Sequence, residues 1–126
     1  AYYARHHWKP YINHARSAGA GAPWYHELRY ETLLEDPPPH AAALFAFLGV
    51  DHDEATVRQC LEQASFERLA GRRPGSEDRR SHFRKGIVGD WRNHFDDAAT
   101  QAFEREAGDL LDRLGYCDEV PLSEAA

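Results

Sequence analysis

Residues 83–95 read FRKGIVGDWRNHF, and this stretch decides how the rest of the chain is interpreted. Arg84 offers a planar fork of hydrogen-bond donors, and Lys85 adds a compact positive charge. Gly86 has no side chain, so the backbone can approach a ligand closely at that position. Such a loop suits a phosphate group. An isolated Arg-Lys-Gly tripeptide, in contrast, is more often a solvated basic loop.

The distribution of charge favours an anion site in the same region. The 126-residue chain has a formal net charge of −6, which disfavours nonspecific nucleic-acid binding as its main role. Residues 68–94 nevertheless hold eight Lys or Arg residues against three acidic residues, a local charge of +5. We therefore expect a local anion site and no nucleic-acid partner.

Local signals predict a mostly helical chain. Hydrophobic residues make up 42% and charged residues 29%, as in a folded globular domain. Four or five helices are expected, and four of them are placed at residues 2–17, 36–48, 53–64 and 96–115. In the third of them, Val57, Cys60 and Leu61 are expected to face inward.

One short strand is expected at residues 24–30, where bulky and polar side chains alternate. Residues 71–89 are rich in Gly, Arg and Ser and lack apolar periodicity, which predicts a long functional or mobile loop. A single strand needs neighbours for its backbone hydrogen bonds. Together with the absence of Met, this predicts that residues of a longer protein complete the sheet.

The whole string from 83 to 95 resembles the C-terminal signature of the PAPS-dependent sulfotransferases. In that signature Arg-Lys-Gly, two variable residues and Gly-Asp-Trp precede the last helix. The family uses Arg-Lys-Gly to hold the 3′-phosphate of the donor PAPS, 3′-phosphoadenosine 5′-phosphosulfate. The resemblance therefore implies this role for Arg84, Lys85 and Gly86, with Phe83 beside them in the donor site.

Two further segments occur in the order found in this family. Residues 28–37, LRYETLLEDP, look like the strand that ends in Tyr-Glu, so by resemblance Tyr30 contacts the adenine. Residues 64–69, ASFERL, are similar to the Ser-Phe segment, which implies Ser65 in the donor site and Phe66 stacked on adenine. From the residues alone, Tyr30 would be a strand-end aromatic residue and Phe66 an ordinary core residue.

The resemblance implies an α/β, P-loop-type sulfotransferase fold. Residues 1–126 would be the mostly helical C-terminal part of a single domain, with one short strand. The family's N-terminal phosphate-binding loop has no counterpart, since no Gly-x-x-x-x-Gly-Lys-Ser/Thr sequence occurs. The full protein is expected to transfer a sulfuryl group from PAPS to a hydroxyl or amine and to release adenosine 3′,5′-bisphosphate. This chain alone is expected to be inactive.

The sequence leaves the catalytic base, the acceptor and the oligomeric state open. In this family the base is usually a His upstream of the matched region, so no residue is assigned here. The acceptor is expected to be a small molecule, a glycan or a lipid. No stretch approaches the roughly 18 apolar residues that cross a bilayer, and no signal pattern begins the chain, so we expect a cytoplasmic protein without membrane insertion. Two departures from the family are Ala64 and Asp96, which stand where relatives often have Thr.

No metal site is predicted. The eight His residues lack acidic or Cys partners at the spacing of three or four converging ligands, and Cys60 and Cys117 show no CxxC spacing. The alternative function is a noncatalytic helical module whose residues 68–94 bind phosphate groups or a nucleotide. Specificity for a 3′-phosphorylated adenosine would favour the sulfotransferase, whereas a general anion patch would prefer the highest charge and weaken steeply with salt.

Overall fold

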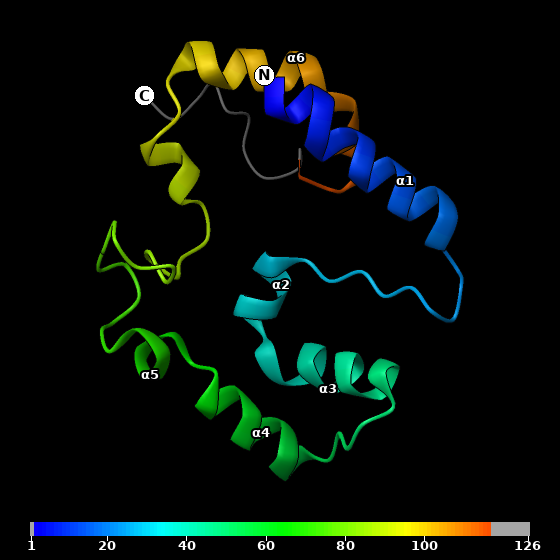
Figure 1. Cartoon of the computed structure of the whole chain (residues 1–126), viewed down its shortest axis with the longest axis vertical. Coiled ribbons are helices and arrows are strands. Elements are labelled where there is room, and N and C mark those ends of the chain that lie inside the picture. Colours follow the sequence, from blue (N-terminus) through cyan, green and yellow to red (C-terminus); the bar gives the residue numbers. More distant parts are fainter. Residues whose placement is uncertain (1, 117–126) are drawn as a thin grey trace. The chain divides into compact units, whose positions relative to one another are not determined.

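The computed structural model describes residues 2–116 and divides the chain into two compact units. The first unit comprises Ala1–Tyr25 with Asp90–Ala126, and the second comprises His26–Gly89. Both units are helical (Figure 1), and buried apolar residues give each a small core of its own.

The longer helices confirm the four predicted ones. The elements in chain order are η1 (Ala4–Trp8), α1 (Lys9–Gly19), α2 (Tyr30–Glu35), α3 (Pro37–Leu48), α4 (Glu54–Gln63), α5 (Phe66–Ala70), η2 (Asp90–Asn93) and α6 (Asp97–Arg113). Element η1 is a π-helical turn that continues into α1, and η2 is a short 3₁₀-helix. The short elements α2, α5 and η2 are additional to the predicted helices.

In the first unit, η1 and α1 associate with α6. The rings of Trp8 and Phe103 have centroids 5.7 Å apart, and Leu110 is fully buried. At the edge of this contact, Lys9 Nζ donates hydrogen bonds to Asp109 Oδ1 at 2.5 Å and to the carbonyl oxygen of Glu106 at 3.2 Å. A small apolar core flanked by an ion pair therefore joins the two helices.

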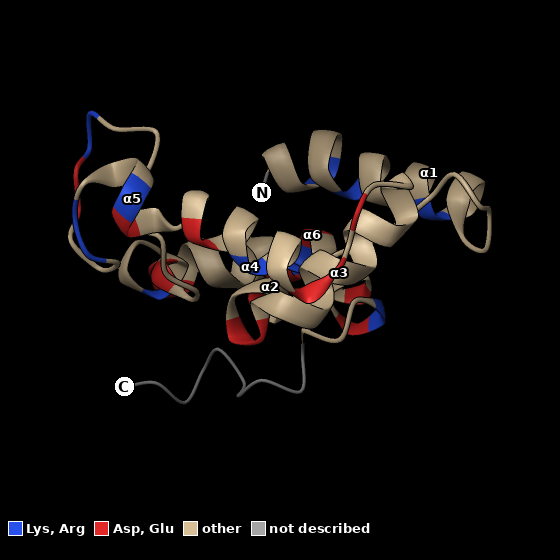
Figure 2. Cartoon of the chain, turned by 90° about the horizontal axis from the view of Figure 1, so that it is seen from below, with Lys and Arg blue, Asp and Glu red and all other residues tan. Residues whose placement is uncertain are grey.

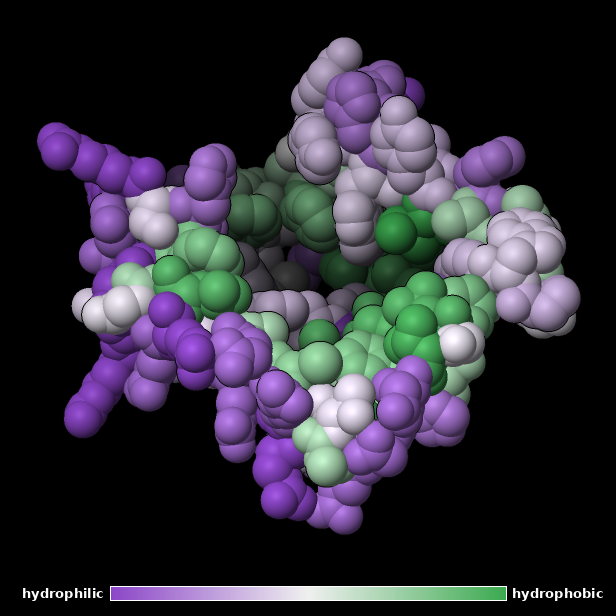
Figure 3. Space-filling view, turned by 60° about the horizontal axis from the view of Figure 1, so that its bottom comes forward, coloured by the Kyte–Doolittle hydropathy of each residue, from purple (hydrophilic) through white to green (hydrophobic). Residues whose placement is uncertain are grey.

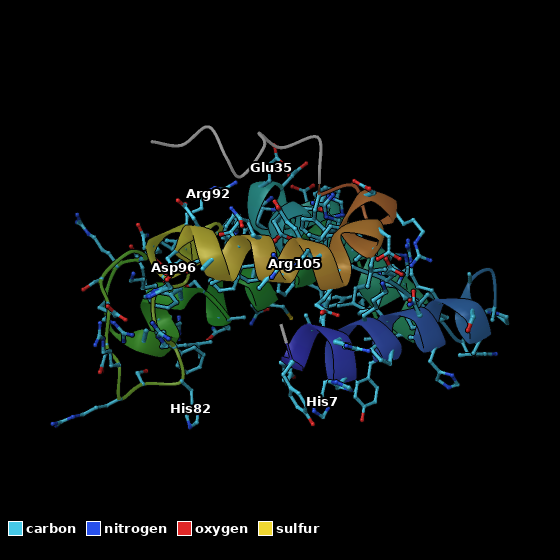
Figure 4. The ribbon with its side chains drawn as sticks, turned by 90° about the horizontal axis from the view of Figure 1, so that it is seen from above. His7, Glu35, His82, Arg92, Asp96 and Arg105 are labelled. Carbon is cyan, nitrogen blue, oxygen red and sulfur yellow. The ribbon has the colours of Figure 1, made fainter. Side chains whose placement is uncertain are left out.

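The start of α6 follows the predicted cap. Asp96 Oδ1 accepts a hydrogen bond from the backbone N–H of Ala99 at 2.7 Å, which satisfies one donor of the first turn. Figure 4 labels Asp96 at this end of α6 and Arg105 farther along the same helix. Asp96 is thus an N-terminal cap of α6.

In the second unit, α3 packs against both α2 and α4. Its core consists of Ala41 from α3 and Val57 from α4. Gly49 ends α3 at φ 70°, the left-handed conformation that glycine adopts without steric cost. Asp53 caps α4, and hydrogen bonds from the Thr56 hydroxyl and amide and from the Ala55 amide lower the pKa of Asp53 to about 2.

The predicted strand at residues 24–30 is wrong, because no strand forms among residues 2–116. Arg29 has extended backbone, with φ −83° and ψ 136°, but a strand needs a hydrogen-bonded neighbour, and Tyr30 already begins α2. The prediction that Cys60 faces inward is also wrong, since Cys60 is exposed and Val57 occupies the buried face of α4. Cys117 lies outside the described residues.

Several large apolar side chains are exposed. In the second unit, Leu48 at the end of α3 is 59% exposed, and Val50, two residues farther on, is 51% exposed. Figure 3 shows hydrophobic surface among the hydrophilic residues of the face in view. None of the helices in the described part of the chain has the length and apolar character needed to cross a membrane.

We expect Leu110→Ala to lower the free energy of unfolding of the first unit by about 2 kcal/mol or more, because truncation of a fully buried Leu leaves a cavity. Leu111→Ala is the matched control, since Leu111 lies on the same helix and is only half-buried. The three tryptophans all lie in this unit, so urea unfolding followed by tryptophan fluorescence measures it selectively. Equal losses in the two variants would contradict a core centred on Leu110.

Candidate functional site

Most of the predicted donor-binding residues lie in the loop that follows α5. Residues 71–89 form neither helix nor strand, which confirms the predicted loop. Basic and acidic residues both occur along the chain beside α5 (Figure 2). The positive charge of this segment therefore has counter-charges within the loop itself.

The Arg84 guanidinium already holds a carboxylate. Its Nη2 donates a hydrogen bond to Glu77 Oε1 at 2.8 Å, and Arg79 Nε lies 3.5 Å from the same oxygen. The hydrogen bond from Arg84 is the main cause that lowers the pKa of Glu77 below its usual value, and the charges of Lys85 and Arg79 act in the same direction. The side chain of Arg84 is thus placed to bind an oxyanion.

The loop backbone lies directly on the ring of Phe66. Gly86 has φ 64°, and a Cβ atom at this position would lie 2.3 Å from Cδ2 of Phe66. No real Cβ contact is that short, so only glycine fits here. Phe66 is the first residue of α5, and the Ser65 hydroxyl caps this helix by accepting from the Arg68 amide at 3.4 Å. The structure therefore brings the Ser-Phe segment and the Arg-Lys-Gly segment together.

Backbone hydrogen bonds across the loop fix the Arg-Lys-Gly segment. The Gly75 amide donates to the carbonyl oxygen of Lys85 at 2.8 Å, and the Asp78 amide donates to that of Arg84 at 3.1 Å. Arg72 Nη2 donates to the same Arg84 oxygen at 2.9 Å. The sequence places Arg72 among the loop's cations but indicates no role for it, because a bond from a side chain to a distant carbonyl leaves no local pattern.

Two predicted donor-site side chains, those of Tyr30 and Phe83, are about half exposed. Tyr30 is the first residue of α2 and is 50% exposed. Among the described residues, α2 packs on α3 and α5 contacts α4, while α2 and α5 are not a packed pair. The ring of Phe83 is 43% exposed. The roles of Tyr30 and Phe83 in donor binding stay predictions.

Residues 90–95, the second half of the string 83–95, belong to the first unit, and their side chains contact one another and α6. Asp90 Oδ1 accepts a hydrogen bond from Asn93 Nδ2 at 3.0 Å, and Asp90 Oδ2 lies 3.1 Å from His94 Nε2. The rings of Trp91 and Phe95 meet edge to face, with centroids 5.8 Å apart. Phe95 in turn packs against Phe103 of α6. These contacts tie the residues after Gly89 to the last helix.

The histidines form no metal centre in the described part of the chain. Across residues 2–116, no three His, Cys, Asp or Glu side chains gather as ligands. His82 is exposed, and its side chain extends away from the loop (Figure 4). The side chains of the loop at residues 71–89 can bind an anion. The contacts described above identify no catalytic base among residues 2–116.

Comparisons with known proteins point in one direction. A family model described as a sulfotransferase domain matches residues 3–115. Sulfotransferase 1C2 of Homo sapiens is 29% identical over 61% of this chain and 29% of its own length. Flavonol 3-sulfotransferase of Flaveria bidentis is 28% identical over 70% of this chain and 33% of its own length. Cytosolic sulfotransferase 1 of Arabidopsis thaliana is 34% identical over 53% of this chain and 24% of its own length. No solved structure gives a significant match.

We expect Gly86→Ala to displace the loop from Phe66. Gly49→Ala is the matched control, because Gly49 has a similar φ of 70° but no atom within 4 Å of the position that a methyl group would take. Both variants carry the backbone cost of a left-handed non-glycine residue, about 1–2 kcal/mol, and only Gly86→Ala adds the clash. Amide and aromatic NMR shifts around Phe66 should change in Gly86→Ala alone. Unchanged shifts there would contradict the close contact.

We expect the pKa of Glu77, followed by NMR, to lie below its usual value and to rise toward it in Arg84→Ala. A carboxyl whose pKa is depressed in the folded state contributes stability above its ordinary pKa, and this contribution is lost as the pH falls through the folded-state value. The ion pair should therefore open on acidification. Arg80→Ala removes an equal charge from the same loop without removing the hydrogen bond and serves as the control. A Glu77 pKa that is insensitive to Arg84→Ala would contradict the pairing.

Proposed function

The chain belongs to the sulfotransferase domain family, and on this premise we propose that it binds the adenine and 3′-phosphate of PAPS in a sulfotransferase. Residues 83–86 take the 3′-phosphate, and Phe66, with Ser65 and Tyr30, forms the adenine side. The whole protein transfers a sulfuryl group from PAPS to a hydroxyl or amine of the acceptor. Adenosine 3′,5′-bisphosphate is the product that leaves this site.

The contact of Gly86 with Phe66 carries this proposal. It places an aromatic ring and a basic, glycine-containing loop side by side, although the two residues are far apart in sequence. A nucleotide that carries a phosphate on its ribose can use both features only if the aromatic ring and the basic loop lie close enough for one molecule to contact both. Stacking of a base on an aromatic side chain is worth about 1–3 kcal/mol, and the guanidinium adds charge-assisted hydrogen bonds to the phosphate.

The ion pair with Glu77 supports phosphate as the ligand of Arg84. The hydrogen bond between them, 2.8 Å long, has a geometry that an oxyanion satisfies. A ribose 3′-phosphate carries more charge and more acceptor oxygens than a carboxylate, so it can replace Glu77 on the planar guanidinium fork. Lys85 is half-buried next to Arg84 and adds a second positive charge.

In the proposed reaction, the bond from the sulfuryl sulfur to the phosphate oxygen of PAPS breaks as the acceptor forms a bond to sulfur. The acceptor proton goes to a general base, and the electron pair of the broken bond stays on the 5′-phosphate. The residues of this chain act by holding the nucleotide end of the donor in place, so that the sulfuryl group is held in position for attack by the acceptor. They do not touch the transferred group in this proposal.

The remaining groups are proposed to come from the rest of a single sulfotransferase domain, of which residues 1–126 are the C-terminal part. The chain spans about a third or less of the length of the curated relatives described above, at 29%, 33% and 24%. The extended backbone at Arg29 and the exposed Leu48 and Val50 would then be covered by the P-loop-type sheet. The chain alone is proposed to be inactive for this reason.

The acceptor and the compartment follow from the relatives by analogy. One relative is named as a flavonol sulfotransferase, which supports a small molecule rather than a glycan or lipid as the acceptor. Another is named as a cytosolic enzyme, which supports a cytoplasmic location. The net charge of −6 argues against nucleic acid as a partner.

We expect the full chain to bind adenosine 3′,5′-bisphosphate more tightly than adenosine 2′,5′-bisphosphate in calorimetric titrations. The two ligands carry the same two phosphate groups and the same charge, so only the position of the phosphate on the ribose distinguishes them. Arg84→Ala should weaken binding of the bisphosphate by about 10- to 100-fold, the loss of a hydrogen bond between charged groups. Arg80→Ala, which removes the same charge from an exposed position of the loop, should have little effect.

Equal affinity for the two nucleotides, together with a steep loss of both on addition of salt, would favour the noncatalytic anion-binding module instead. Absence of binding by a chain with a helical circular-dichroism spectrum would count against a self-sufficient donor site. The same titration of the whole protein then tests whether the remaining part of the domain completes the site.

A further inference from the structure

Arg72 lies two residues beyond the end of α5 and is half-buried, and its guanidinium lies among backbone carbonyl groups. Its Nε donates to the carbonyl oxygen of Ser76 at 3.0 Å, and Nη1 donates to that of Ala70 at 3.2 Å. Nη2 donates to the carbonyl oxygens of Phe83 and Arg84, the latter at 2.9 Å. One side chain therefore joins the end of α5 to both sides of the loop.

Arg72 also contacts the aromatic ring on which the loop rests. Its Cζ lies 5.2 Å from the centroid of Phe66, within the range of a cation–π interaction. The backbone of Gly86 lies against the same ring. Arg72, Phe66 and the Arg-Lys-Gly segment thus form one packed cluster in which each member touches the others.

The position of Arg72 shows which way the backbone of residues 83–85 faces. The peptide bonds are trans, so each C=O points in the opposite direction from the N–H of the same peptide. Since the carbonyl groups of Phe83 and Arg84 point toward Arg72, the N–H groups of Arg84 and Lys85 point away from it. Backbone N–H groups that face one side of a loop form a common anion-binding arrangement.

An arginine is required for these contacts, and its loop neighbours do not share them. The hydrogen-bond acceptors of Arg72 are backbone carbonyl oxygens, whereas Arg84 and Arg79 pair with Glu77. Arg73 is exposed although it is the next residue. A lysine has three donors on a single nitrogen and cannot reproduce a planar fork directed at four carbonyl groups.

Resting on the function proposed above, we propose that Arg72 is a positioning residue that sets residues 83–86 on the Phe66 ring and thereby sets the preference for a nucleotide with a 3′-phosphate. It acts through the loop and does not itself contact the phosphate. Arg72 provides the specificity of the site by fixing the orientation of groups that other residues supply.

The test compares Arg72→Lys with Arg73→Lys in the full chain. The two variants carry the same substitution at adjacent positions and leave the net charge unchanged. Calorimetric titration with adenosine 3′,5′-bisphosphate and with adenosine 5′-monophosphate gives the ratio of the two affinities. We expect Arg72→Lys to reduce the preference for the bisphosphate by about tenfold or more, as when one charge-assisted hydrogen bond is lost, with the monophosphate affinity retained. Arg73→Lys should leave the preference unchanged.

A second measurement needs no ligand. If Arg72 positions the loop, the pKa of Glu77 followed by NMR should rise toward its usual value in Arg72→Lys, because Arg84 no longer meets the carboxylate, and should stay low in Arg73→Lys. Arg72→Gln provides the same comparison where the lysine variant loses its helical circular-dichroism spectrum.

The outcomes separate this inference from the function on which it rests. A wild-type chain that binds both nucleotides equally overturns the proposed function, and the Glu77 pKa then decides on Arg72 alone. A wild-type preference that Arg72→Lys leaves intact overturns the inference. Equal losses of affinity for both nucleotides also overturn it, because they would give Arg72 a purely structural role.

Discussion

The carbonyl groups of residues 83–85 need hydrogen-bond donors, and this requirement shapes the candidate site. A loop without helix or strand has no regular ladder that satisfies its backbone. Here the donors are the amides of Gly75 and Asp78 and the guanidinium of Arg72. Because these donors hold the carbonyl side of the loop, its orientation is fixed, and the Gly86 backbone can rest on the Phe66 ring. The anion site that we propose would therefore be a consequence of how the loop satisfies its own polar groups.

The same loop carries a counter-ion, and this changes what its positive charge can do. A wholly basic loop would attract any anion, with an affinity set mainly by ligand charge. Glu77 occupies Arg84, so a ligand must replace a carboxylate that is already hydrogen-bonded. Both side chains are partly exposed, and exposed ion pairs are weak, so a phosphate could displace Glu77 from Arg84 in the site that we propose. This competition would lower the affinity for every anion that needs Arg84 and does not by itself select the 3′ position.

The features that the sequence predicts correctly are those determined by neighbouring residues. Gly49 ends α3 and Asp96 caps α6, each through atoms within a few residues of its own position. The predicted strand at residues 24–30 is wrong, because a strand depends on partners that no local pattern supplies. The role of Arg72 escapes prediction for a related reason, since its bonds to the loop span 11 and 12 residues. The grouping of Phe66 with Gly86 is implied by resemblance and not by spacing.

The string from 83 to 95 meets two separate physical requirements, and the division lies between Gly89 and Asp90. Before it, the residues contact Phe66 and Glu77 and present the groups that suit an anion. After it, the side chains bond to one another and pack toward α6 through Phe95. A sequence that kept only residues 90–95 would retain the attachment to the last helix without the basic groups of the loop. Residues 90–95 alone are therefore a signal of fold, and the donor-binding inference depends on Arg84, Lys85 and the contact of Gly86 with Phe66.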